Sequence, residues 1–270
     1  MPEQFLWMVW AELRKVFSRG SGIGALIIAF LVGFIAVGAM WEVRGWQDGA
    51  SMNGVPVSSM VSFSGISAAG WALQLRNFFV LPMLLLLATA SAVAGEYGER
   101  TLRELTVRPV SRWSILAAKA VALCILSLST LALSLVPSLA IGAGVFGLSV
   151  EGGPPIQALL GGYAASFLSD VGLIAIGMLA SLFVSSVGGV VVTVVLVLMA
   201  DRGIWLVLQA AKMFKVAAAE SLVQWTLVNA LGCWEGWKEG WVPAQFAALG
   251  VVILVTGAAS VLRFSRMDVP

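Results

Sequence analysis

The sequence of 270 residues lacks histidine altogether and contains only two cysteines, Cys124 and Cys233. Without histidine, a Ser-His-Asp or Cys-His catalytic centre, an HExxH metal site and a histidine-ligated haem are all excluded. Two cysteines are also too few for a disulfide framework. We expect them to be small apolar packing residues that do not pair, with a Cys233–Cys233 bridge between two copies as the alternative. The composition thus favours a chain without a catalytic centre or a metal site of its own.

Charged residues are scarce as well. They make up 11% of the chain and apolar residues 60%, whereas an average soluble domain has about 25% charged residues. A globule of this size cannot bury so much apolar surface, because even a 300-residue fold leaves about a quarter of its unfolded-chain area in water. The net charge of +2 is not gathered into a basic face for nucleic acid. These proportions exclude a soluble enzyme, a nucleic-acid-binding protein and a disordered regulator, and they predict a protein embedded in a lipid bilayer.

Six apolar runs are long enough to cross a bilayer core of about 30 Å, which takes about 20 helical residues. They cover residues 22–41, 71–94, 114–136, 156–181, 188–208 and 243–262, and the third could continue towards residue 146. Lipid leaves no water to satisfy open backbone groups, and a membrane barrel would need short alternating segments instead of continuous runs. The sequence therefore predicts an all-α fold, with residues 1–270 forming a single polytopic membrane domain of six transmembrane helices.

The basic residues near the ends of these runs indicate an orientation, because Lys and Arg are enriched in short cytoplasmic loops. With both termini inside, ten of the 16 basic residues fall on the inner side. They are Arg14, Lys15, Arg19, Arg100, Arg103, Arg108, Arg112, Lys119, Arg263 and Arg266. This bias predicts a multi-pass membrane protein with both termini in the cytoplasm.

Residues 1–20 are amphipathic. Apolar side chains recur at helical spacing from Leu6 to Phe17, and charged residues fall mostly between them. This pattern is typical of a helix that lies in the membrane interface. A simple inward extension of the first span is the alternative.

A second amphipathic stretch, residues 203–242, precedes the sixth run and ends in the tryptophan-rich sequence GCWEGWKEGW. It predicts short interfacial or re-entrant helices on the outer face. Asp201 and Arg202 lie about two-thirds along the fifth run, and we interpret them as an early end of that span and the beginning of the outer helices.

Polar residues inside the runs are few. Asp170 lies near the middle of the fourth run, where a carboxylate costs at least about 2.5 kcal/mol on insertion scales, so it should face protein or a water-filled cavity. It is a candidate for a substrate path or a gate, with a packing role beside Ser166 and Ser169 as the alternative. Arg76 lies near the outer end of the second run, where we expect its side chain to reach the interface. Pro82 should kink that run.

The inner loop between the second and third runs concentrates charge in this apolar chain. It reads GEYGERTLRELTVRPVSRWSILAAK from Gly95 to Lys119. Residues 101–107 can form two helical turns that stop before Pro109, and Ser111 can cap the third span. A plain anchoring loop would need only a few lysines. A short charged helix held between two spans favours the docking of another cytoplasmic protein.

The pattern GE…RTLREL…RPVSRW.ILAAK resembles the coupling segment of bacterial ABC-2 type transporter permeases. The matching residues are Gly95, Glu96, Arg100, Thr101, Leu102, Leu105, Arg108, Pro109, Val110, Ser111, Arg112 and Lys119. The resemblance implies that two permease chains, as a homodimer, assemble with two copies of an ABC ATPase subunit. It also implies that residues 95–113 form the segment that contacts each ATPase. The contact residues carried over from the family are Glu96, Arg100, Leu102, Arg103, Leu105, Arg108 and Arg112.

This resemblance implies a non-catalytic transmembrane subunit that couples ATP hydrolysis in a partner to movement of a substrate, with export the commoner direction. The chain has no GxxxxGK[ST] motif and no inner loop long enough for a nucleotide-binding domain, so ATP and Mg²⁺ would be bound by the partner. Two alternatives remain. One is a secondary carrier driven by an ion gradient, and the other is a membrane scaffold that transmits force to an extracytoplasmic partner without transport.

Overall fold

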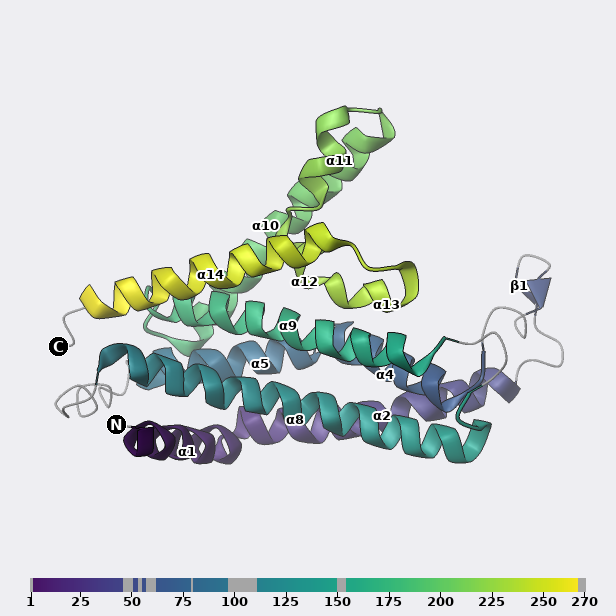
Figure 1. Cartoon of the computed structure of the whole chain (residues 1–270), viewed down its shortest axis with the longest axis horizontal. Helices are drawn as coiled ribbons and strands as arrows, with labels where there is room; N and C mark the ends of the chain where they lie inside the picture. Colours follow the sequence, from purple (N-terminus) through teal and green to yellow (C-terminus); the bar gives the residue numbers. More distant parts are fainter. Residues whose placement is uncertain are drawn as a thin grey trace.

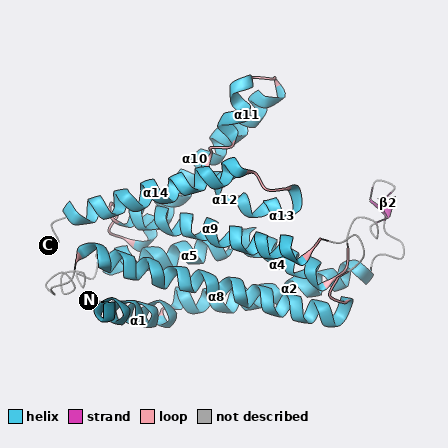
Figure 2. Cartoon of the chain, viewed as in Figure 1, coloured by secondary structure: helices cyan, strands magenta, loops and turns pink. Residues whose placement is uncertain are grey.

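The structure is a computed structural model that describes residues 2–45, 51–52, 55–56, 62–78, 80–96, 111–149 and 154–266. These residues are almost entirely helical, which confirms the predicted fold class (Figure 2). Within the described ranges, the strands are the two-residue segments β1 (Ser51–Met52) and β2 (Val55–Pro56), which pair antiparallel.

Five helices are long and apolar enough to cross a membrane. They are α2 (Gly20–Gly45), α8 (Arg112–Phe146), α9 (Ile156–Ser181), α10 (Val187–Met213) and α14 (Pro243–Arg266). The bounds of α9 coincide with the fourth predicted run, and α8 continues through Pro137 to Phe146. The chain thus has the helices of a multi-pass membrane protein.

The second predicted run is not one straight helix. It is divided into α4 (Gly65–Phe78) and α5 (Val80–Ala90), with η1 (Ser91–Gly95) as a π-helical turn at its end. The two main parts are bent by 50° at the break, and counting them as one span gives six spans instead of five. Pro82 explains the break, because it has no N–H to donate to the carbonyl group of Phe78, four residues earlier.

The fifth predicted run is longer than expected. We interpreted Asp201 and Arg202 as the end of that span, and this interpretation is wrong, because α10 continues without interruption to Met213. The Asp201 carboxylate instead accepts a hydrogen bond of 2.7 Å from the backbone N–H of Val228, at the start of α12. A charge that looked like the end of a helix is therefore a cap for another one.

Shorter helices complete the fold. They are α1 (Pro2–Ser18), which packs along α8, and α11 (Ala217–Val223), α12 (Leu227–Leu231), η2 (Cys233–Glu235) and α13 (Gly236–Glu239) between α10 and α14. Figure 1 shows α2, α8, α9 and the α4–α5 pair running lengthwise together, with the start of α1 and the end of α14 at one end. The helix α14 covers α9. The first part of α10 packs against α5 and α9, whereas its later part and α11 project away from the bundle.

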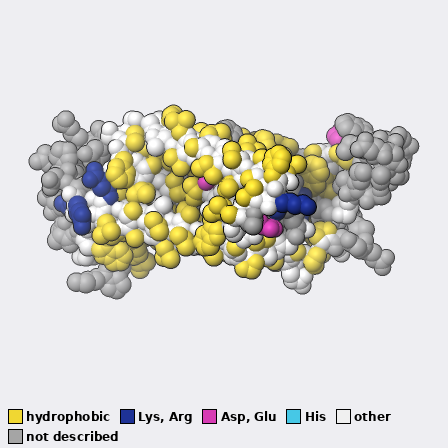
Figure 3. Space-filling model, turned by 90° about the horizontal axis from the view of Figure 1, so that it is seen from above, with side chains coloured by type: hydrophobic (Ala, Val, Ile, Leu, Met, Phe, Trp, Pro, Cys, Tyr) yellow, Lys and Arg dark blue, Asp and Glu magenta, His cyan; other side chains and the backbone are white. Residues whose placement is uncertain are grey.

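Small residues allow the helices to approach closely inside the bundle, and large apolar residues face outwards. Gly65 in α4 faces α8 so closely that an added Cβ atom would lie 2.7 Å from the backbone nitrogen of Ala143, so a larger residue would separate the two helices. Large apolar side chains such as Phe30 and Leu254 are exposed. In Figure 3 hydrophobic side chains are spread over the whole described face, and Lys and Arg gather in two patches, one at the left end and one to the right of the centre.

Candidate functional site

A group of five charged side chains, which we call the base cluster, lies where the segment 95–113 leaves the bundle. Its members are Glu12, Lys15, Arg19, Glu96 and Lys119. The Glu96 side chain is 3% exposed and the Lys119 side chain 1% exposed, and the Lys119 Nζ atom donates to Glu96 at 2.6 Å. Two more donors approach Glu96, the Nζ atom of Lys15 at 3.0 Å and the Nη2 atom of Arg19 at 3.5 Å.

Glu12 is the second acid of the base cluster. Its two oxygens bind Lys119 at 2.9 Å and Lys15 at 3.0 Å, so each lysine lies between the two carboxylates. Three positive and two negative charges leave the base cluster with a net charge of +1. Buried charges are tolerated only when they are paired and hydrogen-bonded, and here every charged member has a partner of opposite sign.

The pairing shifts the pKa values of two members. Burial alone would raise the pKa of the Glu96 carboxyl, but the charge of Lys119 and the hydrogen bonds from Lys119 and Lys15 outweigh it and lower this pKa below its ordinary value. Burial alone would lower the pKa of Lys15, but hydrogen bonds and charges from Glu12 and Glu96 outweigh it and raise this pKa. Both residues are therefore charged at neutral pH.

The base cluster joins three elements. Glu12 and Lys15 belong to α1, Lys119 belongs to α8, and Glu96 directly follows η1. The guanidinium group of Arg19 also donates to the backbone carbonyl of Ser91, the first residue of η1, at 2.7 Å. Isolated π-helical turns are frequent at functional sites because they redirect the residues that follow them. Any displacement of the chain after Glu96 therefore acts on α1 and α8 together.

A second group, which we call the mid-span cluster, lies inside the bundle. Its members are Arg76, Asn77, Ser127, Thr130, Ser166 and Asp170. The Nη2 atom of Arg76 lies 2.5 Å from Asp170 Oδ2, and the Ser127 hydroxyl donates to the same oxygen. Arg76 also donates to Thr130 at 3.0 Å and to the Asn77 side-chain oxygen at 2.7 Å.

The position of Arg76 corrects a prediction. We expected its side chain to reach the membrane interface, but it is 2% exposed and points to Asp170. A charged residue in lipid must be paired, and the partners belong to α4 and α9, far apart in the sequence. The Nε atom of Arg76 and the Nδ2 atom of Asn77 are buried and have no hydrogen-bond partner within the described part of the chain.

Asp170 was a candidate for a substrate path or for packing, and the structure places it in the mid-span cluster at 4% exposure. It bridges α9 to α4 through Arg76 and to α8 through Ser127. A carboxylate held by a guanidinium group and a hydroxyl group is fixed in position. The arrangement thus ties together the three helices that lie at the centre of the bundle.

The predicted coupling residues are only partly within the described ranges. Arg100, Leu102, Arg103, Leu105 and Arg108 lie outside them. Glu96 belongs to the base cluster, as described above. Arg112 begins α8, and its Nη1 atom lies 3.4 Å from the carbonyl oxygens of Phe264 and Ser265 at the end of α14. In addition to the helices that the coupling segment joins, its start is therefore attached to α1 and its end to α14.

Sequence reasoning did not find the base cluster as a unit. Glu12, Lys15 and Arg19 were assigned to the polar face of an interfacial helix, and Lys119 to the inner basic residues. The available signal was spacing, since steps of three and four residues place Glu12, Lys15 and Arg19 on one side of a helix.

The cysteines have the predicted character. Cys124 and Cys233 are both free thiols, which confirms that they do not pair with each other. Cys233 is fully buried beside Ser169, so a bridge between two copies would require this region to unpack. Over the described ranges, no group of three or more His, Cys, Asp or Glu residues is arranged to hold a metal ion.

No curated protein matches the chain. A family model described as "Protein of unknown function (DUF2705)" matches residues 26–270. The match includes the whole mid-span cluster, together with Glu96 and Lys119 of the base cluster, and it begins after α1. Because the matched region is most of the sequence, the chain belongs to the DUF2705 family.

Proposed function

We propose that this chain is the membrane-spanning permease subunit of an ATP-driven ABC-2 type transporter in the bacterial inner membrane. The observation that carries the proposal is the base cluster. Glu96, from which the coupling segment departs, is buried and paired with Lys15 of α1 and Lys119 of α8. A segment that receives force from an ATPase needs such an attachment, because a flexible one would absorb the displacement.

The energetics of the base cluster favour rigid transmission. Removing one partner of a buried ion pair typically costs about 3–5 kcal/mol, because the other charge is left unpaired. Moving Glu96 away from Lys119 would have a comparable cost, so α1, α8 and the start of the coupling segment move as one unit. Coupled transporters need elements of this kind, which shift between discrete arrangements instead of deforming continuously.

The remaining parts follow from the same proposal. Two copies of a separate ABC ATPase subunit bind ATP and Mg²⁺, contact residues 95–113 of two permease chains, and drive movement of a substrate, most commonly export. With both termini in the cytoplasm, α1 lies in the inner interface and α11, α12 and α13 lie at the outer face. The two permease chains form a homodimer.

The test is a mild-detergent pull-down of the tagged full-length chain with mass spectrometry and an ATP hydrolysis assay. We expect an ATPase in roughly equimolar amount from the wild-type chain. Arg108→Glu and Leu105→Asp should each remove it without loss of membrane insertion, because both residues lie in the coupling segment. Arg44→Glu, at the end of α2, is the matched control and should retain it. Recovery of the ATPase with Arg108→Glu would contradict the proposal.

The mid-span cluster favours one alternative function, a carrier driven by an ion gradient, because intramembrane charges often mark ion pathways. The two functions differ in energy source. Loss of transport on collapse of the proton gradient, with ATP kept high, would favour the carrier, and so would a wild-type preparation without any ATPase. A third outcome, an ATPase that no substrate stimulates, would favour a scaffold that transmits force to an extracytoplasmic partner.

A further inference from the structure

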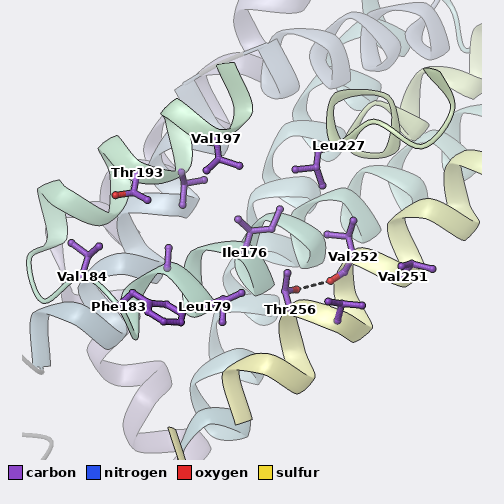
Figure 4. A pocket seen from close by; sticks show the side chains of 13 residues that line it. Ile176, Leu179, Phe183, Val184, Thr193, Val197, Leu227, Val251, Val252 and Thr256 are labelled. Atoms are coloured by element: carbon purple, nitrogen blue, oxygen red, sulfur yellow. Dashed lines mark hydrogen bonds between the residues drawn. The ribbon is translucent and has the colours of Figure 1, made fainter. Parts of the chain in front are cut away.

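A cavity of about 510 Å³ opens between α9, α10 and α14 (Figure 4). Its lining combines aliphatic side chains, one phenylalanine and two threonines. Ile176, Leu179 and Phe183 come from α9 and the turn after it, Val197 from α10, and Val252 from α14. A volume of this size is within the range of ordinary ligand pockets, which is roughly 300–1,000 Å³.

Water is a poor occupant for this cavity. The hydroxyl group of Thr256, one of the two threonines, already donates to the backbone carbonyl of Val252 at 2.6 Å. A water molecule needs two to four polar partners, and apolar cavities without them stay dry or bind apolar molecules. The cavity exists because α10 diverges from the bundle while α14 lies along α9 (Figure 1). It is therefore suited to an apolar chain that enters from the bilayer.

A cation lies at one end of this cavity. The guanidinium group of Arg263 lies over the ring of Phe183, with its Cζ atom 5.1 Å from the ring centroid. Phe183 lines the cavity, and Arg263 is in the last turn of α14, at its C-terminal end. The next basic residue of that turn, Arg266, is also exposed, and within the described ranges no carboxylate forms an ion pair with either arginine.

We propose that the cavity binds an anionic phospholipid, with an acyl chain between α9, α10 and α14 and the phosphate group at Arg263. The two parts of the site match the two parts of this molecule. The apolar lining suits the chain, and the planar guanidinium donors of an arginine suit a phosphate group. Stacking on Phe183 fixes the guanidinium plane while its N–H groups stay accessible. Phosphatidylcholine also carries a phosphate group, but its choline cation offsets the negative charge that Arg263 would bind, so an anionic headgroup is favoured.

Charge complementarity favours this occupant over a second copy of the chain. A neighbouring helix could fill an apolar cavity, but apolar side chains would offer no anion to the exposed Arg263 and Arg266. A phospholipid satisfies both requirements with one molecule. The proposal requires only that the helices lie in a bilayer, and it does not depend on coupling to an ATPase.

The test uses the full-length chain in detergent, titrated with phosphatidylglycerol or with phosphatidylcholine of the same acyl chains, and read by native mass spectrometry. We expect one tightly retained lipid per chain and a preference for phosphatidylglycerol of about fivefold, the contribution of one basic residue near an anionic headgroup. Arg263→Gln should abolish the preference. Val197→Trp, which fills the cavity, should reduce retention of both lipids.

Arg202→Gln is the matched control, since Arg202 also stacks on an aromatic ring, that of Trp205, but away from the cavity. It should leave the preference unchanged. Equal retention of the two lipids by the wild-type chain would overturn the proposal, and so would the same loss of preference with Arg202→Gln as with Arg263→Gln. A lipid-free dimer of the wild-type chain that becomes a monomer in Val197→Trp would also overturn it, because a second copy would then occupy the cavity.

Discussion

Arg76 and Asp170 lie 94 positions apart in the sequence, and they share one hydrogen-bonded cluster inside the helix bundle. Each of them alone is a charge in an apolar segment, where an unpaired charge is expensive. Together, with Ser127 and Thr130, they form a neutral and almost fully buried group. This pairing therefore explains why an otherwise apolar bundle tolerates a guanidinium group near its centre.

Removal of one member of this pair should be much worse than removal of both. We expect Asp170→Ala to lower the free energy of unfolding by about 3–5 kcal/mol, because Arg76 is left buried and charged. The double variant Arg76→Met with Asp170→Leu should recover most of that loss. The measurement is unfolding in detergent micelles, with Arg202→Met as an exposed control. If Asp170→Ala lowered the free energy of unfolding as little as the control does, the pairing would not stabilise the bundle as proposed.

Sequence patterns predict individual residues of the sites better than their partners. The cost of a mid-membrane carboxylate singles out Asp170, and the charge density after Gly95 singles out Glu96. Neither signal identifies Arg76 or Lys119 as the partner, because the pairs form between different helices. Long-range pairing depends on how the helices pack, and periodicity in one segment carries no information about the neighbour that it faces.

At the scale of elements, the apolar runs give the helices and their approximate bounds, since length and hydropathy are local properties. Deviations occur where a contact or a proline intervenes. The break before Val80 agrees with the kink that the sequence predicts at Pro82, and α10 continues past Asp201, whose carboxylate accepts from Val228 of α12. The attachment of α1 depends on the base cluster, which no local pattern shows.

The attachment of α1 should depend on pH in a defined window. Glu96 has a lowered pKa, so its contribution is present above its ordinary value of 4.5 and is lost as pH falls through the lower folded-state value. Lys15 has a raised pKa, so its contribution is present below 10.5 and is lost as pH rises through the higher folded-state value. We therefore expect α1 to stay attached between pH 4.5 and 10.5 and to detach in more acidic solution.

Spin labels on the exposed residues Gln4 of α1 and Val121 of α8 would measure this, with Cys124 replaced by Ser. The distance distribution should be narrow at neutral pH and broaden in acid. Lys119→Met should broaden it already at neutral pH, because both carboxylates lose their buried partner, whereas the exposed control Lys212→Met should not. A distribution that is unchanged in Lys119→Met would show that apolar contacts alone hold α1.

At the scale of the whole molecule, the arrangement of helix ends makes the number of spans testable. The start of α8 and the C-terminal end of α14 lie at one end of the bundle, the start of α2 lies nearer to that end, and the end of α2 lies at the other (Figure 1). This arrangement places the bent pair of α4 and α5 across the whole bundle. If the bent pair crosses the bilayer, the start of α2, the start of α8 and the C-terminal end of α14 lie on the same side of the membrane.

Single cysteines in a cysteine-free chain would test this with a membrane-impermeant thiol reagent. We expect Ser18→Cys, Ser111→Cys and Arg266→Cys to react only from the cytoplasmic side, and Glu42→Cys and Leu148→Cys only from the opposite side. The positive-inside bias sets which side of the membrane is cytoplasmic. The crossing of the bent pair returns Ser111 to the same side as Ser18. Reaction of Ser111→Cys from the same side as Glu42→Cys would mean that α4 and α5 do not cross together.

The length of α8 has a consequence for the lipid around it. Its 35 residues span about 52 Å at 1.5 Å per residue, well beyond a hydrocarbon core of about 30 Å. Such a hydrophobic mismatch is relieved by tilting, or by local thickening of the bilayer. Because Lys119 in the second turn of α8 is anchored to Glu12 and Glu96, a change of tilt would be passed to α1 as well. A change in bilayer thickness would thus act on the position of α1 through the tilt of α8.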